Sequence, residues 1–463
     1  ENHCAIASLI VQNLFGGKLL CVSLEGTRFA SAKSHYFNQL PDGSVVDITY
    51  QQFGGYLFKA WQPEERSRED FLDLTRFFWR EWKLYFALAA LLLFAFVRGR
   101  ANGHPFVLAD ANAWGALLLL IPIVDLARAH GGRFFSRVSA PLLAGLAWLF
   151  FETFFLFYFF SHGFPDASRD VYLWIRRTGV GEVTRILPGQ DAFRIFFQSH
   201  LYALFAVFGG LALLADRERP LRRGLLPASL GLAVILISFS RSLWIGLATG
   251  FFVFFGWMLA KRKQEIARWL FRWLIAAAAA VALVFVLLRL PFPRVEPGAL
   301  SDLMIARADA GEAAVGSRWN LLPVLWKEIK KHPLAGNGFG ATATYQSKDP
   351  RVVRETGGSY TTYAFEWGWL DLWMKMGVLI IPLFALIFTR LGRIVWRSDL
   401  PDWQRLSAIC SLVALVIVHF FTPYVNHPLG LLFLMLMECW IVARAGMQNR
   451  PLPDALPVAH VRG

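Results

Sequence analysis

The sequence predicts a polytopic all-α membrane protein with about ten transmembrane helices and one large loop, preceded by a small N-terminal α/β segment. Hydrophobic residues make up 56% of the 463 residues and charged residues only 17%, whereas soluble chains average roughly 45–50% apolar and about 25% charged residues. Long apolar blocks recur after residue 80, and the 18 Trp and 42 Phe suit anchoring at membrane interfaces. The composition therefore argues against a single soluble enzyme core.

The first part of the chain, residues 1–77, predicts a small soluble α/β segment. An apolar helix is expected over Ile6–Phe15, and the pair Gly16-Gly17 that follows it is typical of a helix end. Strand-like runs follow at Lys18–Ser23 and Ser44–Thr49. The first eight residues lack the basic start and apolar core of a signal peptide, so none is expected.

The second part, residues 80–446, predicts a membrane domain, and residues 447–463 a short cytoplasmic tail. Each apolar block approaches the ~20 residues that an α-helix needs to cross a bilayer. The predicted membrane helices cover residues 82–97, 111–127, 138–161, 194–215, 224–238, 242–260, 270–289, 366–389, 405–421 and 428–444. The fifth and sixth are short for full spans, so a re-entrant pair is the alternative. A loop over 290–365 separates the seventh helix from the eighth.

Basic residues predict that both termini lie in the cytoplasm, because cytoplasmic loops of membrane proteins are enriched in Lys and Arg. With this orientation the short outer links hold only Arg98, Arg100 and Arg241. The inner links hold Arg128, Arg133, Arg137, Arg217, Arg219, Arg222, Arg223, Lys261, Arg262, Lys263, Arg268, Arg272, Arg390, Arg393, Arg397 and Arg405. Much of the net charge of +14 then reflects topology. Membrane lipids are therefore expected partners and nucleic acid is not.

The four cysteines, Cys4, Cys21, Cys410 and Cys439, have neither the spacing of a metal site nor the pattern of a disulfide framework. We therefore expect no metal and no cofactor. The predicted orientation places Cys4 in the reducing cytoplasm, which is compatible with a free thiol.

The run Ser238-Phe239-Ser240-Arg241-Ser242 lies between two apolar blocks at the predicted outer boundary. An arginine in hydrocarbon costs a few kcal/mol, so Arg241 should face a cavity, a headgroup or a partner. Its guanidinium can bind phosphate through two parallel hydrogen bonds, and the serine hydroxyls add donors. The structural alternative is an arginine that extends to the membrane interface.

The loop over residues 290–365 contains an amphipathic helix, predicted over residues 318–331. Trp319, Leu322, Trp326 and Ile329 form its apolar stripe. Pro333 and a glycine-rich turn end the helix. The simplest interpretation of its lysines is a surface helix that lies on the membrane.

In this order and spacing, the Ser240-Arg241 break, the Arg318-Trp319 helix and the turn Pro333–Gly340 resemble the O-antigen ligase/polymerase superfamily over residues 80–446. Those proteins are glycosyltransferases of the bacterial inner membrane. The resemblance implies transfer of a glycan from an undecaprenyl-pyrophosphate-linked donor to a hydroxyl of a glycan or lipid acceptor at the periplasmic face, without metal or nucleotide. It also implies that Arg241 and Arg318 clamp the donor pyrophosphate, with Arg185 as a third arginine before the fourth membrane helix. Fixed cations would stabilise the negative charge that develops on the leaving group.

The sequence departs from that family at one position. Ligases carry a histidine at the outer start of the helix after the large loop, where this chain has Glu366. Glu366 could act as the base if burial raised its pKa, or it could pair with Arg318 or Arg241 in a structural role. A polymerase-type or other transferase is therefore as well supported as a ligase. Asp371 is a second acidic candidate.

Three histidines complete the candidates in the membrane domain. His427 lies in a short outer turn, where it could line the substrate site or be solvated. His200 and His419 lie in apolar helices and are expected to be core or cavity-facing polar residues.

The N-terminal segment carries a second, independent constellation. Cys4 lies at a helix start, where the helix dipole can lower a thiol pKa, and His35 and Asp47 follow on strand-like pieces. In that order they could act as nucleophile, base and orienting group; purely structural roles are the alternative. Cys4-Ala5, Gln12, Gly16-Gly17, His35-Tyr36-Phe37-Asn38, Leu40-Pro41-Asp42-Gly43 and Asp47-Ile48-Thr49 resemble the small YunG-like family over residues 1–77. The resemblance implies a papain-like, partial domain.

Two other functions remain open at the level of sequence. A transporter or flippase of lipid-linked or anionic solutes would also have about ten helices with polar residues between them. Transporters often show repeated halves, and the sequence has no evident internal repeat, whereas a transferase needs the long amphipathic outer loop as a lid. The third function is a membrane anchor for a cytoplasmic thiol enzyme, which would not require so large a membrane domain.

Overall fold

The computed structural model describes residues 2–24, 34–47, 64–65, 68–162, 165–186, 193–216, 218–290, 313–347, 350–398 and 400–448. The chain divides into two compact units, Glu1–Leu91 and Leu92–Gly463. The long helix α2 (Arg68–Ala101) runs from the first unit into the second.

The first unit packs one helix on a small sheet. Helix α1 (Asn2–Phe15) precedes strand β1, and the strands lie in the order β3-β2-β1-β4, with every neighbouring pair antiparallel. The strands are β1 (Lys18–Ser23), β2 (Ser34–Gln39), β3 (Val45–Val46) and β4 (Glu64–Glu65). Leu9 of α1 and Leu19 of β1 are buried together against Tyr36. The predicted helix and first strand are present. Of the second predicted strand, Val45 and Val46 form β3, and Ile48 and Thr49 lie outside the described residues.

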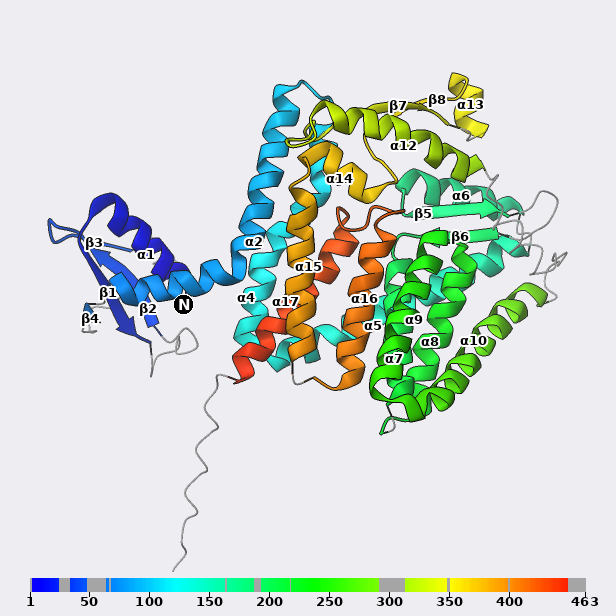
Figure 1. The fold of residues 1–463 in the computed structure, drawn as a ribbon, viewed down its shortest axis with the longest axis horizontal. Helices are drawn as coiled ribbons and strands as arrows, with labels where there is room; N and C mark the ends of the chain where they lie inside the picture. Colours follow the sequence, from blue (N-terminus) through cyan, green and yellow to red (C-terminus); the bar gives the residue numbers. More distant parts are fainter. Residues whose placement is uncertain are drawn as a thin grey trace, which may run out of the picture. The chain divides into compact units, whose positions relative to one another are not determined.

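The second unit is helical, apart from two short β-ribbons (Figure 1). Its helices are α3 (Val107–Ala111), η3 (Asn112–Leu119), α4 (Leu120–His130), α5 (Gly132–Ser161), α6 (Pro165–Thr178), α7 (His200–Ala215), α8 (Leu221–Ser238), α9 (Arg241–Lys261), η4 (Lys263–Glu265), α10 (Ile266–Arg289), α12 (Ala313–Lys331), α13 (Pro350–Thr356), α14 (Gly368–Met376), α15 (Ile380–Arg397), α16 (Asp402–Val418) and α17 (Pro428–Gln448). The ribbons are β5–β6 (Gly181–Arg185 with Phe193–Phe197) and β7–β8 (Ala343–Gln346 with Ser359–Thr362).

Six helical segments of the described chain are long and apolar enough to cross a membrane. They cover Trp82–Ala101, Val107–Arg128, Gly132–Ser161, Leu221–Ser238, Arg241–Lys261 and Lys263–Arg289. The protein is therefore a mostly helical, multi-pass membrane protein, as predicted. At 18 and 21 residues, α8 and α9 are each long enough to cross a membrane, whereas the sequence analysis took this pair to be short.

The other four predicted spans do not meet the same criterion, and two of them were wrong in detail. The predicted helix over 194–215 begins only at His200, because residues 193–197 form strand β6. The predicted single helix over 366–389 is two helices, α14 and α15, which are separated at Gly377. Gly377 has a φ of +82°, and a Cβ there would lie 1.9 Å from the Leu334 carbonyl oxygen, so the break is a site of close backbone approach.

Helix α7 lies in the interior of the unit and is apolar on all sides, as expected of a buried helix. It packs closely against α8 because glycines face each other across the interface: a Cβ on Gly210 would lie 2.7 Å from the Gly224 carbonyl oxygen. Small residues at such contacts let two membrane helices approach closely. This packing fixes the position of α8, whose last residue, Ser238, enters the candidate site.

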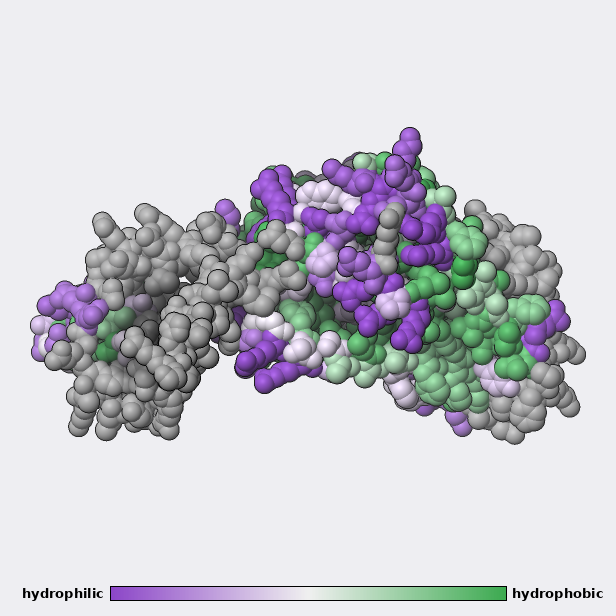
Figure 2. All heavy atoms as spheres, turned by 90° about the horizontal axis from the view of Figure 1, so that it is seen from below, coloured by the Kyte–Doolittle hydropathy of each residue, from purple (hydrophilic) through white to green (hydrophobic). Residues whose placement is uncertain are grey.

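The two ends of this unit differ. At the upper end in Figure 1, α12, α13 and the β7–β8 ribbon cover α14, with α6 and the β5–β6 ribbon beside them. Seen from below in Figure 2, hydrophilic side chains gather in the middle of the opposite end, with hydrophobic surface beside them.

Candidate active site

The turn between α8 and α9 is the centre of the candidate site. Phe239 has a φ of 45°, and it is the one non-glycine residue with positive φ in the described chain. Such a left-handed residue costs of order 1 kcal/mol and is held by its surroundings. Here Ser240 N–H donates to Ser238 Oγ (3.2 Å), and the Ser240 and Ser242 hydroxyls are 3.0 Å apart. The turn therefore fixes Arg241 as the first residue of α9.

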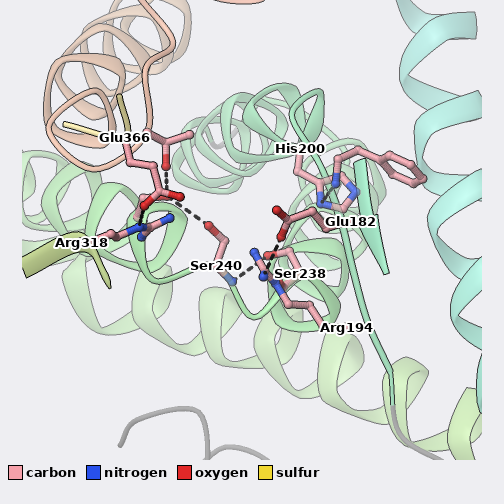
Figure 3. Close-up of polar contacts among 10 residues, drawn as sticks. Glu182, Arg194, His200, Ser238, Ser240, Arg318 and Glu366 are labelled. Carbon is pink, nitrogen blue, oxygen red and sulfur yellow. Dashed lines mark hydrogen bonds and ion pairs between the residues drawn. The ribbon is translucent and has the colours of Figure 1, made fainter. Parts of the chain in front are cut away.

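Arg194 joins this turn from strand β6. Its Nε donates to the Ser238 carbonyl oxygen (2.7 Å), and its Nη1 lies 3.1 Å from Glu182 Oε2 on β5 (Figure 3). Only 14% of its side chain is exposed. Arg194 is not among the site residues predicted from the sequence, because hydropathy predicts that residue 194 begins a membrane helix.

The electrostatics indicate that three arginines share this site. Burial is the largest cause that lowers the pKa of Arg194; Glu182 raises it, the nearby cations Arg318 and Arg241 lower it further, and Glu366 raises it slightly. A guanidinium stays protonated in proteins. Three arginines and two carboxylates therefore leave one net positive charge, which suits an anionic ligand.

Arg318 comes to the site from α12. Its Nε forms an ion pair with Glu366 Oε2, and 34% and 52% of the two side chains are exposed (Figure 3). The Arg318 carbonyl oxygen accepts a hydrogen bond from Trp367 Nε1 (3.0 Å), which ties the start of α12 to the segment that leads into α14. Arg318 and Glu366, both predicted from the sequence, are thus brought together.

Helix α12 is longer than predicted, and its buried face shares only Ile329 with the predicted stripe. Leu321, Leu325 and Ile329 are buried in a cluster with Phe365 of the chain before α14 and Met374 of α14. By contrast, Trp319 and Trp326 of the predicted stripe are 60% and 44% exposed. Their rings contact Trp367 and Trp373 edge to face. The helix is therefore held against α14 by Leu321, Leu325 and Ile329.

The loop between α16 and α17 completes the site. Thr422 Oγ1 donates to Ser242 Oγ of α9 (3.0 Å). Tyr424 is fully buried, and it lies close enough to Arg194 for the two side chains to interact electrostatically. The site is thus assembled from four parts of the chain: the β5–β6 ribbon, the α8–α9 turn, α12 with Glu366, and this loop.

Arg185, the third predicted arginine, lies on the other side of the ribbon. In the β5–β6 register Arg185 is opposite Phe193, and Thr184 is opposite Arg194. Because successive side chains point to opposite faces of a strand, Arg185 and Arg194 lie on opposite faces. The Arg185 guanidinium sits over the Phe193 ring at 5.3 Å, and the residue is exposed. Arg194, and not Arg185, therefore lies on the face of the ribbon that meets the α8–α9 turn, and a role for Arg185 in donor binding stays a prediction.

The predicted histidines make local contacts. His427 Nδ1 accepts a hydrogen bond from the Leu429 N–H (3.3 Å) at the start of α17, and burial lowers the pKa of His427, which favours the neutral form. His200 Nε2 lies 3.0 Å from Thr153 Oγ1, and His419 Nδ1 accepts from the Val425 N–H (3.1 Å). Both of these side chains are fully buried, as expected for core polar residues. A role for His427 in substrate binding stays a prediction.

Asp371, the second acidic candidate, belongs to a buried ionic network. Lys375 Nζ lies 2.6 Å from Asp110 Oδ1 and 2.7 Å from Asp371 Oδ1. Asn426 Nδ2 donates to Asp371 Oδ2 (2.8 Å), and Asp110 Oδ2 accepts from the Gly340 N–H (2.8 Å). The network therefore joins α3, α14, the α16–α17 loop and the glycine-rich turn.

The glycine-rich turn fastens α12 to the bundle. Gly338 N–H donates to the Lys375 carbonyl oxygen (2.9 Å), and Phe339 N–H donates to the Ala95 carbonyl oxygen of α2 (3.0 Å). A Cβ on Gly338 would lie 2.4 Å from the Gly99 backbone nitrogen, and φ at Gly338 is +86°. Only glycine satisfies both conditions without strain. The turn is thus a close-packed anchor for the loop that contains α12.

The first unit brings two of its three predicted residues together. His35 Nε2 lies 2.6 Å from Asp47 Oδ2, and the His35 side chain is fully buried. Cys4 lies in the first part of α1, but its side chain is outside the described residues. Asn38 Nδ2 donates to the Ser8 carbonyl oxygen (2.9 Å), which holds α1 against β2. Because Nε2 faces Asp47, His35 would exchange a proton with a third group through Nδ1.

If Cys4 is a nucleophile paired with His35, replacing His35 by alanine should slow the alkylation of Cys4 at neutral pH. The expected change is up to about tenfold, because an ordinary thiol is only a few per cent thiolate at pH 7. The measurement is the iodoacetamide rate, followed by mass spectrometry in a Cys21→Ala background, with His332→Ala as control. An unchanged rate in a folded His35→Ala variant would support purely structural roles.

Among the described residues, no group of three or more His, Cys, Asp or Glu side chains could hold a metal ion.

Comparison with known families agrees with both resemblances. The family model described as O-Antigen ligase matches residues 226–385, and the model described as YunG protein matches residues 1–84. The first match contains Arg241, Arg318 and Glu366, whereas Arg194 lies outside it. No curated protein and no solved structure matches the chain.

Proposed function

We propose that the protein is a glycosyltransferase of the bacterial inner membrane, which moves a glycan from an undecaprenyl-pyrophosphate carrier to an acceptor hydroxyl at the periplasmic face. The observation that carries this proposal is that Arg194, which donates to the Ser238 carbonyl oxygen of the α8–α9 turn, lies within electrostatic reach of Arg241 and Arg318 from two other parts of the chain. Two of the three lie within the segment that matches the O-Antigen ligase model.

The arrangement suits displacement of a pyrophosphate leaving group. The acceptor oxygen forms a bond to the anomeric carbon of the sugar, and the bond from that carbon to the pyrophosphate oxygen breaks with its electron pair. The hydroxyl proton leaves the acceptor, and negative charge develops on undecaprenyl pyrophosphate. Guanidinium groups fixed before the reaction stabilise that charge without reorganising, and they suit phosphate oxygens because they donate in pairs.

Glu366 acts in this proposal as a positioning residue for Arg318. A general base works best when its pKa lies near the operating pH, and for a carboxylate this requires burial. Glu366 is instead 52% exposed and ion-paired with Arg318. Its geometry therefore favours the structural alternative that the sequence left open.

Replacing Glu366 by glutamine should lower transfer by less than about tenfold and leave the pH–rate profile unchanged. Loss of a general base would cost about 10²–10⁴-fold and would remove the limb of the profile that belongs to its ionisation. Steady-state transfer rates across a pH series test this, with Glu328→Gln, a carboxylate of α12 paired with Lys331, as control. A larger loss with a changed profile would restore Glu366 as the base.

The location of the arginines also favours a transferase over a transporter. Transporter sites typically lie near the bilayer midplane, at the interface of repeated halves. Here Arg241 is the first residue of α9 and Arg194 lies in a ribbon that precedes α7, so the cations lie at the end of the bundle. Helix α12 packs over the same end.

Reconstitution tests the function directly. Purified protein in proteoliposomes receives a lipid-linked glycan together with either a lipid acceptor or a second lipid-linked glycan, and release of undecaprenyl pyrophosphate is measured. Release with the lipid acceptor indicates a ligase, and release with the second glycan indicates a polymerase. A carrier that stays loaded with every acceptor would contradict the proposal, and movement of the intact carrier between leaflets would indicate a flippase.

A further inference from the structure

A cavity of about 420 Å³ opens at the end of the membrane unit away from the arginine site. Its lining comes from the C-terminal parts of α9 and α15 and the N-terminal part of α16, and consists of Trp257, Lys261, Arg262, Trp396, Asp402, Arg405 and Leu406. The volume lies within the range of about 300–1,000 Å³ that is typical of small-molecule sites. The cavity is large enough for a phosphate-bearing headgroup.

The cavity lies one bilayer thickness from the arginine site. Helix α9 carries Arg241 at its first residue and Lys261 at its last. Its 21 residues rise by about 31 Å at 1.5 Å per residue, close to the ~30 Å of a bilayer's hydrocarbon core. The cavity is therefore at the opposite membrane interface, where tryptophans such as Trp257 and Trp396 are enriched.

The charges along the lining favour an anion. Three of the lining residues, Lys261, Arg262 and Arg405, are cations, and Asp402 is the one carboxylate among them. Asp402 forms ion pairs with both Arg262 (2.9 Å) and Arg405. One carboxylate thus faces three cations, which leaves two net positive charges along this lining. Glu265, which lies 3.8 Å from Arg262 outside the lining, reduces the excess.

A second cavity of about 190 Å³ fixes the side from which an anion can enter. It shares Arg262 and Asp402 with the first cavity but is also lined by Asp216 and Glu218. These carboxylates would repel an anion. The positive side of the first cavity is therefore the part lined by Lys261 and Arg405.

We propose that this cavity binds the phosphate headgroup of an anionic phospholipid. Basic pockets between membrane helices are known headgroup sites, and the surface around this end combines hydrophilic with hydrophobic side chains, as an interfacial lipid requires (Figure 2). The bound lipid bridges α9 and α16. The same two helices are linked at the other interface, where Ser242 of α9 meets Thr422 just beyond α16.

The test measures lipid binding to the full-length protein in mild detergent. Native mass spectrometry and thermal unfolding follow titration with phosphatidylglycerol, with zwitterionic phosphatidylethanolamine as reference. A Lys261→Ala/Arg405→Ala double variant should lose phosphatidylglycerol affinity by about 30-fold, since each cation near an anionic lipid surface contributes about 1 kcal/mol and 1.4 kcal/mol is tenfold. Arg268→Ala removes a cation that pairs with Glu265 but does not line the cavity, and should bind like the wild type.

Lys261→Glu provides a variant that leaves both partners of Asp402 in place, and it should weaken phosphatidylglycerol binding at least as much as Lys261→Ala. Equal binding of the two lipids by the wild type, or equal losses in Arg268→Ala and the double variant, would overturn the proposal. Inorganic phosphate that stabilises the wild type as well as phosphatidylglycerol does would show a site for free phosphate, and would also overturn it.

Discussion

Replacing Arg194 by alanine should lower glycan transfer by at least about 10²–10³-fold, the loss typical when one fixed donor to a developing oxyanion is removed. Arg194 is 14% exposed, is aligned by the Ser238 carbonyl oxygen and Glu182, and lies in the field of Arg241 and Arg318. In the proposed reaction, an alanine there removes a cation that stabilises the leaving pyrophosphate. The measurement is the initial rate of undecaprenyl pyrophosphate release by reconstituted protein.

Arg185→Ala is the matched control, because Arg185 belongs to the same ribbon but lies on its opposite face. It should keep transfer within a few-fold of wild type. Arg194→Lys keeps the charge but loses the planar pair of donors, so it should recover only part of the activity. The reverse pattern, with Arg185→Ala inactive and Arg194→Ala active in equally folded protein, would return the role to Arg185.

Arg241 and Arg318, two of the three arginines predicted from the sequence, share a property that Arg194 lacks. Arg241 lies between two apolar blocks, and Arg318 begins the amphipathic helix predicted over residues 318–331, so the sequence pattern marks both positions. Arg194 instead stands within Phe193–Phe197, a run that is apolar enough to be taken for the start of a membrane helix. Its role depends on pairing with residues 181–185, and strand pairing is not encoded in local hydropathy.

The same limit explains the two errors in the outer region. The break between α14 and α15 is set by the approach of Gly377 to Leu334, two residues that are distant in sequence. On α12, the predicted apolar stripe included Trp319 and Trp326 because tryptophan was treated as a purely apolar residue. Tryptophan prefers membrane interfaces, where one edge stays in contact with polar groups, and the buried face of α12 is formed by Leu321, Leu325 and Ile329.

Disrupting the buried ionic network of Lys375, Asp110 and Asp371 should lower the stability of the protein more than any other change proposed here. Replacing Lys375 by methionine should lower the free energy of unfolding by about 3–5 kcal/mol, the usual cost of leaving a buried charge without its partner. Asp110 and Asp371 would then face each other without the cation that lies 2.6 and 2.7 Å from them. Because the network also holds Gly340 and Asn426, the variant should loosen the outer loop and lower transfer as well.

The loss should depend on pH in a defined direction. Burial raises the pKa of Asp371, and Lys375 is the neighbour that opposes this most strongly. Without Lys375 the folded-state pKa rises further above the unfolded value, so the variant is least destabilised at low pH and loses stability as the pH rises through the folded-state pKa. Unfolding in mild detergent with increasing sodium dodecyl sulfate, repeated across pH, measures both effects.

Lys331→Met is the matched control, because Lys331 is an exposed lysine of α12 whose partner Glu328 lies one turn away. A surface pair of this kind contributes about 0–1 kcal/mol, so this variant should unfold nearly as the wild type does, at every pH. If Lys375→Met were equally stable, the two buried carboxylates would have to be protonated or solvated already in the wild type. The network would then not be what holds α14, α3 and the glycine-rich turn together, and the hydrogen bonds of that turn to Ala95 and Lys375 would have to fix the outer loop alone.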